Sequence, residues 1–84
     1  MPRYKVIIGP LAAATIGGLP SGVASALEQR LRELEEEPAQ LAQAVQNKPH
    51  KRTGVFGPHG EGMIIATVSD DHQVVIVDQV IWAG

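Results

Sequence analysis

Residues 63–82 read MIIATVSDDHQVVIVDQVIW, and this stretch decides the fold because it predicts a β-hairpin. Two apolar runs, Met63–Val68 and Val74–Trp82, flank residues 69–72, where Ser and Asp are typical turn formers. Runs joined by so short a turn are expected to be antiparallel neighbours. Met63–Val68 is apolar on both faces, which predicts a central strand that is covered on both sides.

Upstream of the hairpin, a long amphipathic run from Ser21 to Glu37 predicts a helix that packs on the sheet. Its apolar residues step by four, four and three positions, as expected for one face of a helix. They are Val23, Leu27, Leu31 and Leu34. Pro38 either ends this helix or separates it from a further turn, because residues 39–45 are rich in Ala and Gln and could also be helical.

The remaining segments complete the order of elements. Arg3–Ile8 alternates and predicts a strand, and Leu11–Ile16 predicts about two helical turns that end at the following glycines. Residues 47–62 are mostly loop by composition, with a short strand around Thr53–Phe56. The order β-α-α-β-β-β predicts an α+β fold: a small, mostly antiparallel sheet with two N-terminal helices packed on one face.

Composition limits the class of protein. The 84 residues predict a single domain, 1–84, and 44% hydrophobic residues with a mean hydropathy of +0.02 are typical of a globular chain. No cysteine is present, which excludes disulfides, thiolate metal ligands and a cysteine nucleophile. No apolar run approaches the length of a signal peptide or a membrane span, so we expect a cytoplasmic protein without a membrane partner.

Charge is unevenly distributed along the chain. The net charge of −2 argues mildly against a dedicated nucleic-acid binder, yet residues 48–59 hold several cations and no acid. Closely spaced cations such as Lys48, Lys51 and Arg52 can grip a phosphate backbone and stabilise charge at a scissile phosphate. His59 could act as an acid or base near neutral pH. The alternative interpretation is a solvated basic loop with an exposed histidine.

Other motifs point away from cofactors. The glycine-rich segment 57–62 precedes an apolar run rather than a helix, which favours a hairpin turn over a phosphate-binding loop. The three histidines form no HxH or HxxxH pair, and Asp70-Asp71-His72 falls in the expected turn. We therefore expect no metal site and no cofactor. The nucleophile motif GxSxG is also absent.

A set of apolar residues and prolines has a familiar spacing along the chain: Tyr4, Val6, Pro10, Ala12, Leu19, Pro20, Val23, Leu27, Leu31, Leu34, Pro38, Val68, Val74–Val77 and Val80. This frame resembles the RelE/ParE superfamily of toxins of type II toxin–antitoxin systems, over nearly the whole chain. The resemblance implies the same α+β fold.

The resemblance also implies partners and chemistry. Many members cut messenger RNA in the ribosomal A site without a metal, using lysines, arginines and sometimes a histidine or tyrosine. ParE-like members instead poison gyrase. Antitoxins wrap the toxin with a tail that folds on binding. A cognate antitoxin, and ribosome-bound mRNA or gyrase as the target, are the partners that the resemblance implies.

Departures from the family pattern concern the catalytic residues. The usual strand arginine falls on Met63 and the later tyrosine on Ala66, and the last strand leads to Trp82-Ala83-Gly84 in place of a basic segment. Lys48, Lys51 and Arg52 lie near the family's upstream catalytic lysines, and His59 is the candidate for proton transfer. These four residues are the predicted catalytic set.

The function predicted from these features is a RelE/ParE-like toxin with weak or lost ribonuclease activity that acts through protein binding. The alternative is an active ribosome-dependent mRNA interferase, a metal-independent endoribonuclease. The apolar terminal run ending in Val80-Ile81-Trp82 predicts strand addition or helix docking by an antitoxin-like tail, or a homodimer when that tail is missing.

Overall fold

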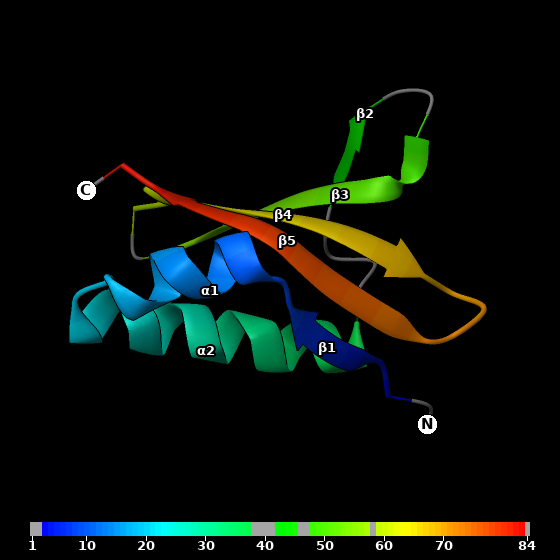
Figure 1. The fold of residues 1–84 in the computed structure, drawn as a ribbon, viewed down its shortest axis with the longest axis horizontal. Coiled ribbons are helices and arrows are strands. Elements are labelled where there is room, and N and C mark those ends of the chain that lie inside the picture. Colours follow the sequence, from blue (N-terminus) through cyan, green and yellow to red (C-terminus); the bar gives the residue numbers. More distant parts are fainter. Residues whose placement is uncertain (1–2, 38–41, 46–47, 58, 84) are drawn as a thin grey trace.

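The computed structural model describes residues 3–37, 42–45, 48–57 and 59–83, with backbone alone for 42–45, 48 and 49. It contains a sheet above two helices (Figure 1). The elements, in chain order, are β1 (Lys5–Ile8), α1 (Pro10–Gly17), α2 (Ser21–Glu36), β2 (Ala42–Val45), β3 (Lys48–Phe56), β4 (Gly62–Ser69) and β5 (Val74–Trp82).

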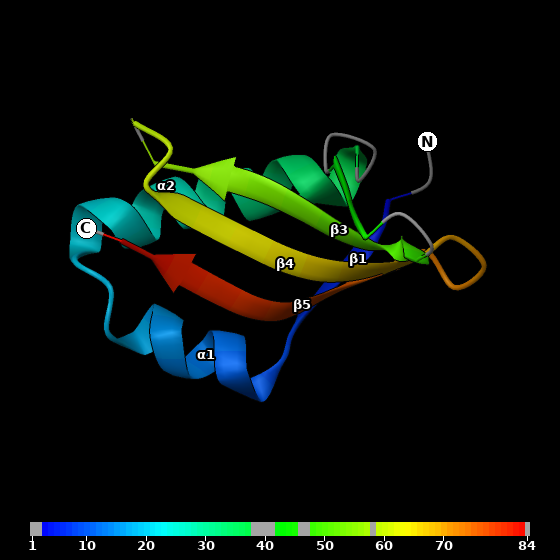
Figure 2. The same cartoon turned by 90° about the horizontal axis from the view of Figure 1, so that it is seen from above.

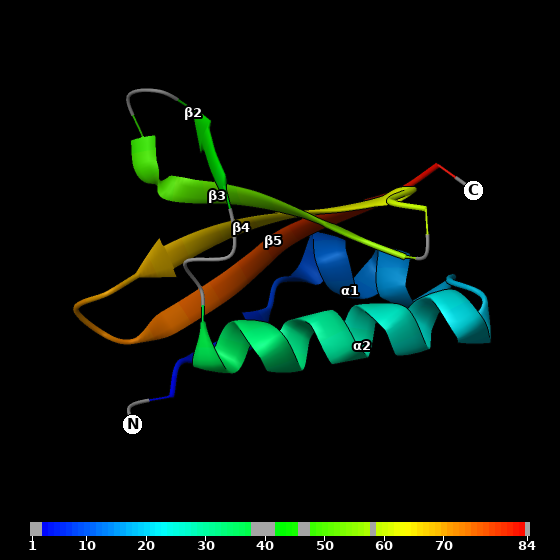
Figure 3. The same cartoon turned by 180° about the vertical axis from the view of Figure 1, so that it is seen from behind.

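The sheet has the strand order β1-β5-β4-β3-β2. β1 is parallel to β5, and the other pairs are antiparallel. Both helices lie on the same face, as Figures 1 and 3 show from opposite sides. The predicted α+β class, the mostly antiparallel sheet and the one-sided helices are confirmed. Because β5 lies between β1 and β4, the terminal strand is not an edge strand, although docking was predicted there.

The middle of the chain differs from the prediction. Ala42–Val45 is a strand paired with β3, not a further helical turn, and β3 begins at Lys48 rather than around Thr53. The reason is tertiary: β4 pairs with β3 from Lys51 to Phe56, and β3 in turn pairs with β2 back to Lys48. Such pairing outweighs local helix propensity and a loop-like composition.

The apolar stripe of α2 packs into the core. Leu27 and Leu34 are fully buried, and Val23 and Leu31 are partly buried against the same cluster. Most of the core comes from the inward residues of β4 and β5, which are Ile64, Ala66, Val68, Val75, Val77 and Val80. Ala12 of α1 and Phe56 of β3 complete the cluster. The prediction that this stripe packs on the sheet is confirmed.

The prediction that Met63–Val68 is covered on both sides is wrong. Burial alternates along β4: Ile64, Ala66 and Val68 are buried, whereas Met63 is 41% exposed. Both helices pack on the same face, and seen from above no helix lies over the opposite one (Figure 2). We call that uncovered side of β3, β4 and β5 the open face.

The turn between β4 and β5 is tied to the N-terminal segment. Tyr4 Oη donates a hydrogen bond to Asp70 Oδ1 at 2.7 Å. This bond, with the nearby carboxylate charge, raises the pKa of Tyr4 above its ordinary value of 10.0, because it stabilises the neutral phenol. The contact therefore links strand β1 to the hairpin that defines the fold.

Tyr4 is the only tyrosine, so its ionisation can be followed directly by ultraviolet absorbance. We expect a titration midpoint above 10.0 in the native chain and a shift back toward 10.0 in Asp70→Asn. Since the pKa is raised in the folded state, the stabilisation is present below pH 10.0 and is lost as pH rises through the folded-state pKa. Identical midpoints in the two proteins would contradict the contact.

Within the described residues, no helix is both long and apolar enough to cross a membrane.

Candidate functional site

One end of the open face carries an apolar row. Val55, Met63 and Ile81 are direct cross-strand partners on β3, β4 and β5. They are 56%, 41% and 42% exposed, respectively, which makes them the most exposed large apolar side chains of these three strands. Cross-strand neighbours in register contact one another along the sheet. The row is therefore a continuous, exposed apolar strip.

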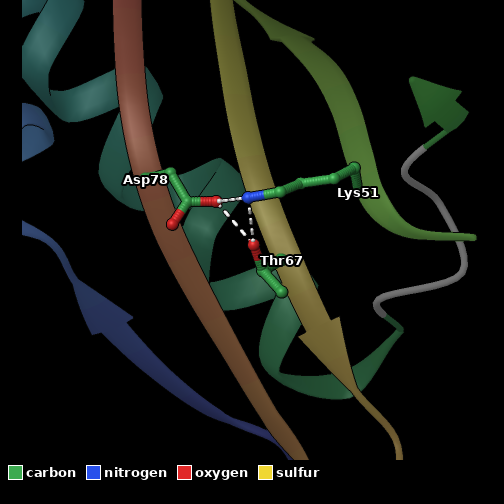
Figure 4. A network of polar contacts seen from close by, with 3 residues as sticks. All are labelled: Lys51, Thr67 and Asp78. Carbon is green, nitrogen blue, oxygen red and sulfur yellow. Dashed lines mark hydrogen bonds and ion pairs between the residues drawn. The ribbon is translucent and has the colours of Figure 1, made fainter. Parts of the chain in front are cut away.

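The other part of the open face carries a polar network of three side chains, Lys51, Thr67 and Asp78 (Figure 4). Lys51 Nζ donates to Thr67 Oγ1 at 2.8 Å and contacts Asp78 Oδ2 at 3.1 Å. Thr67 Oγ1 in turn donates to Asp78 Oδ2 at 2.6 Å. The three strands β3, β4 and β5 each supply one member of a closed triangle.

A β-bulge places Asp78 in this network. Ile65 pairs with Gln79 and Ala66 pairs with Val77, so Asp78 is the extra residue of β5. A bulge bends the strand and redirects a side chain that regular alternation would aim elsewhere. The carboxylate consequently lies on the same face as Lys51.

Among the described side chains of the predicted catalytic set, Lys51 is the cation on the open face, and the network neutralises it. An ammonium group has three donors, and here two of them are used by Thr67 and Asp78. The Lys51 side chain is 40% exposed, so solvent screens the pair and its contribution to stability is small. Its effect on binding is larger, because an incoming phosphate must compete with Asp78 for Lys51.

Arg52 points the other way. Lys51 pairs with the open-face residue Thr67, while Arg52 pairs with buried Ala66 on the helix-facing side. Neighbouring residues of a strand alternate between faces, so Lys51 and Arg52 do not converge on one phosphate. Lys51 and Arg52 are therefore neighbours in the sequence but lie on opposite faces of the sheet.

The other two members of the predicted set are also apart from Lys51. His59 is in the β3–β4 turn, beyond Phe56, and the extended strand from Lys51 to Phe56 alone spans about 17 Å. The His59 backbone N–H donates to Glu61 Oε1 at 3.1 Å, and Gly57 and Gly60 adopt positive φ, so this is the expected hairpin turn. Lys48 opens β3, and its side chain lies outside the described residues.

Asp78 and Thr67 were not predicted as site residues. The available signal was the single acid Asp78 in the mostly apolar run Val74–Trp82, because a carboxylate in such a strand is favoured when a cation faces it. The β-bulge that directs Asp78 toward Lys51 cannot be recognised from the sequence pattern. Among the described residues, no group of three or more His, Cys, Asp or Glu side chains could hold a metal ion.

Comparison with known proteins gives a clear result for the fold. Neither the protein-family models nor the curated proteins yield a match. Among solved structures, the isolated E. coli RelE toxin has a TM-score of 0.81 at 23% identity, covering 96% of this chain and 85% of that one. The fold is RelE-like.

Two complexes show the same likeness. The RelBE2 toxin–antitoxin complex of Mycobacterium tuberculosis has a TM-score of 0.83 at 17% identity, covering 96% of this chain and 99% of that one. The archaeal RelE–RelB complex of Pyrococcus horikoshii has a TM-score of 0.73 at 16% identity, covering 100% and 98%. At these identities the RelE-like fold is what the comparison establishes.

On this RelE-like fold, the position where the resemblance implies an arginine lies in the middle of the apolar row. Met63 is flanked there by Val55 and Ile81, and no charged side chain is part of that row. The surface at this position is therefore apolar rather than cationic.

The role of Asp78 can be measured directly. Asp78→Asn should release Lys51, adding about one phosphate contact and steepening the salt dependence of single-stranded RNA binding by about 0.7 in log–log slope. Lys51→Ala in the same background should reverse the change, and Asp71→Asn, an equal charge change in the exposed turn, should not produce it. Equal slopes for Asp78→Asn and the native chain would show that Asp78 does not restrain Lys51.

Proposed function

We propose that the protein is the toxin component of a type II toxin–antitoxin system, that its ribonuclease activity is weak or lost, and that it acts through protein binding. The observation that carries this proposal is the open face, where Lys51 is neutralised by Asp78 and the neighbouring row is apolar. An apolar strip on a small sheet suits a protein partner better than a polyanion.

Chemistry supports the loss of catalysis. Metal-free RNA cleavage needs a base for the 2′-hydroxyl, cations for the developing charge and an acid for the leaving oxygen. The described part of the open face offers only Lys51 from the predicted set, and that lysine is ion-paired. Since removal of one charge-stabilising group costs about 10²- to 10³-fold in rate, we expect little cleavage.

The RelE-like fold also favours a second candidate, an active ribosome-dependent mRNA interferase. In that case Lys48, Lys51, Arg52 and His59 are the proposed catalytic residues, and the chain has to rearrange on the ribosome, because Arg52 lies on the other face of β3 from Lys51 and His59 lies in the β3–β4 turn. Under either candidate we place its action in the cytoplasm, with mRNA on the ribosome or gyrase as targets to be tested.

A cognate antitoxin is the partner that we propose. The M. tuberculosis and P. horikoshii neighbours are toxin–antitoxin complexes, and the uncovered apolar row of this chain is a surface that a partner can bury. The test is co-expression with the small protein encoded by the neighbouring reading frame, followed by size-exclusion chromatography and calorimetry.

We expect a stable complex, weakened about tenfold or more by Met63→Lys, which places a charge in the apolar row. Leu11→Lys is the matched control, because Leu11 is 68% exposed on α1, outside that row. Absence of any complex, together with normal growth of cells that express the chain alone, would contradict the proposed function.

A further inference from the structure

The outer edge of β1 is an unpaired strand edge. β1 is the first strand in the sheet order, with β5 on its inner side. The Lys5 N–H donates to the Gln73 carbonyl at 2.9 Å and the Gly9 N–H to the Val77 carbonyl at 2.8 Å, so the odd-numbered residues bond toward β5. The Tyr4 N–H instead donates outward, to the carbonyl of Glu35 at 2.7 Å.

The alternation of hydrogen bonds along a parallel pair of strands then determines where the backbone groups of Val6 and Ile8 point. In such a pair every second residue directs both backbone groups to the partner, and the residues between direct theirs away. Val6 and Ile8 therefore present their N–H and C=O groups at the outer edge, where no backbone partner lies within the described residues. Exposed backbone groups of this kind are the template on which another strand pairs.

A groove accompanies this edge. It has a volume of about 250 Å³ and lies between β1 and α2. Its floor is apolar, from Val6, Ile8 and Leu31, and its rim is charged, from Glu28, Arg32 and Glu35. Ile8 is 37% exposed, and the edge from Val6 to Ile8 is apolar. Its protection is limited to the shortness of β1 and to Lys5 at the start of the strand.

We infer that the outer edge of β1 is a strand-addition site for an extended segment of another protein. That segment pairs with the backbone of Val6 and Ile8 and places alternate apolar side chains into the groove. Cations near both of its ends meet the two rim carboxylates. Glu35 already contacts Arg3 at 3.6 Å, so Glu28 offers the stronger attraction. This site goes beyond the proposed function, which rests on the open face.

The order of charges along the rim of the groove disfavours binding of a second copy of this chain at the β1 edge. Along α2 the rim reads acid, base, acid at Glu28, Arg32 and Glu35. A two-fold axis through this edge would set Glu28 against the other copy's Glu35 and Arg32 against itself. Like charges opposite each other are destabilising, so the rim selects a different chain.

The test uses an acetylated and amidated peptide, TKTVTVTKT, in which threonines alternate with two lysines and two valines, so that the lysines flank the valines on the same face of the strand. Binding of the peptide is followed by measuring the hydrogen exchange of the backbone amides in the intact protein. We expect the Val6 and Ile8 amides to exchange roughly tenfold more slowly when the peptide is bound. The same peptide with N-methylated core amides, which cannot form a ladder, should give no protection.

Variants locate the binding. Ile8→Lys and Glu28→Lys should each raise the Kd about tenfold or more. Leu11→Lys and Glu33→Lys, which make an equivalent and an identical charge change at exposed positions outside the groove, should leave the Kd within about twofold. Glu28→Lys keeps the test valid if Ile8→Lys lowers stability. Unchanged exchange of both amides, equal binding of the N-methylated peptide, or dimerisation through β1 would overturn the inference.

Discussion

Leu34→Ala is expected to lower the free energy of unfolding by about 2 to 5 kcal/mol. Leu34 has no exposed surface and lies in the α2 stripe between the helix and the sheet. Truncation removes buried apolar contacts and leaves a cavity, and a domain of this size has little stability in reserve. Urea unfolding followed by the fluorescence of Trp82, the only tryptophan, measures the change.

Leu11→Ala is the matched control, since Leu11 is 68% exposed and the side-chain change is identical. It should cost less than about 0.5 kcal/mol. Similar losses for the two variants would mean that the α2 stripe does not form the core, and the packing of helices on the sheet would have to be revised.

Gly62→Ala is expected to have the second large effect on stability, a loss of about 1 to 3 kcal/mol or more. A Cβ at Gly62 would overlap the ring of Phe56, which is 4% exposed and packed across from Gly62 in the β3–β4 ladder. The ring cannot leave without opening the core. The change in unfolding free energy measures the clash, and Phe56→Leu in the same background should recover part of the loss.

Gly22→Ala is the control for replacing glycine by alanine at a position without a close neighbour. A Cβ at Gly22 meets no atom within 4 Å, and the residue lies in α2, where alanine is favoured over glycine by up to about 1 kcal/mol. Gly22→Ala should therefore be neutral or stabilising. A destabilisation by Gly62→Ala no larger than that of Gly22→Ala would contradict the close approach of Phe56.

Much of the fold was predictable because its signals are local. The four-four-three spacing of Val23, Leu27, Leu31 and Leu34 defines a helix face, and the turn residues after Val68 fix the hairpin. Strand β2 was not predictable, because its extended form depends on pairing with β3 rather than on its own Ala- and Gln-rich sequence. The uncovered face of β4 was missed because apolarity on both sides usually indicates two covering layers.

The candidate site was less predictable than the fold. Sequence proximity suggested that Lys51 and Arg52 act together, but strand alternation sends them to opposite faces. The ion pair of Lys51 with Asp78 joins residues 27 positions apart and depends on a bulge. Contacts between residues so far apart in the sequence depend on how the strands are aligned with one another, and a single sequence does not reveal that alignment.

Messenger-RNA ends on stalled ribosomes, mapped after the chain is induced alone in cells, test the central claim most directly. The claim is that a RelE-like fold has kept its frame while the open face lost the means to cleave RNA. We expect ends no more frequent than in cells that carry the Lys51→Ala, Arg52→Ala double variant. Codon-phased cleavage that is present with the native chain and disappears in the double variant would contradict the account and establish the interferase.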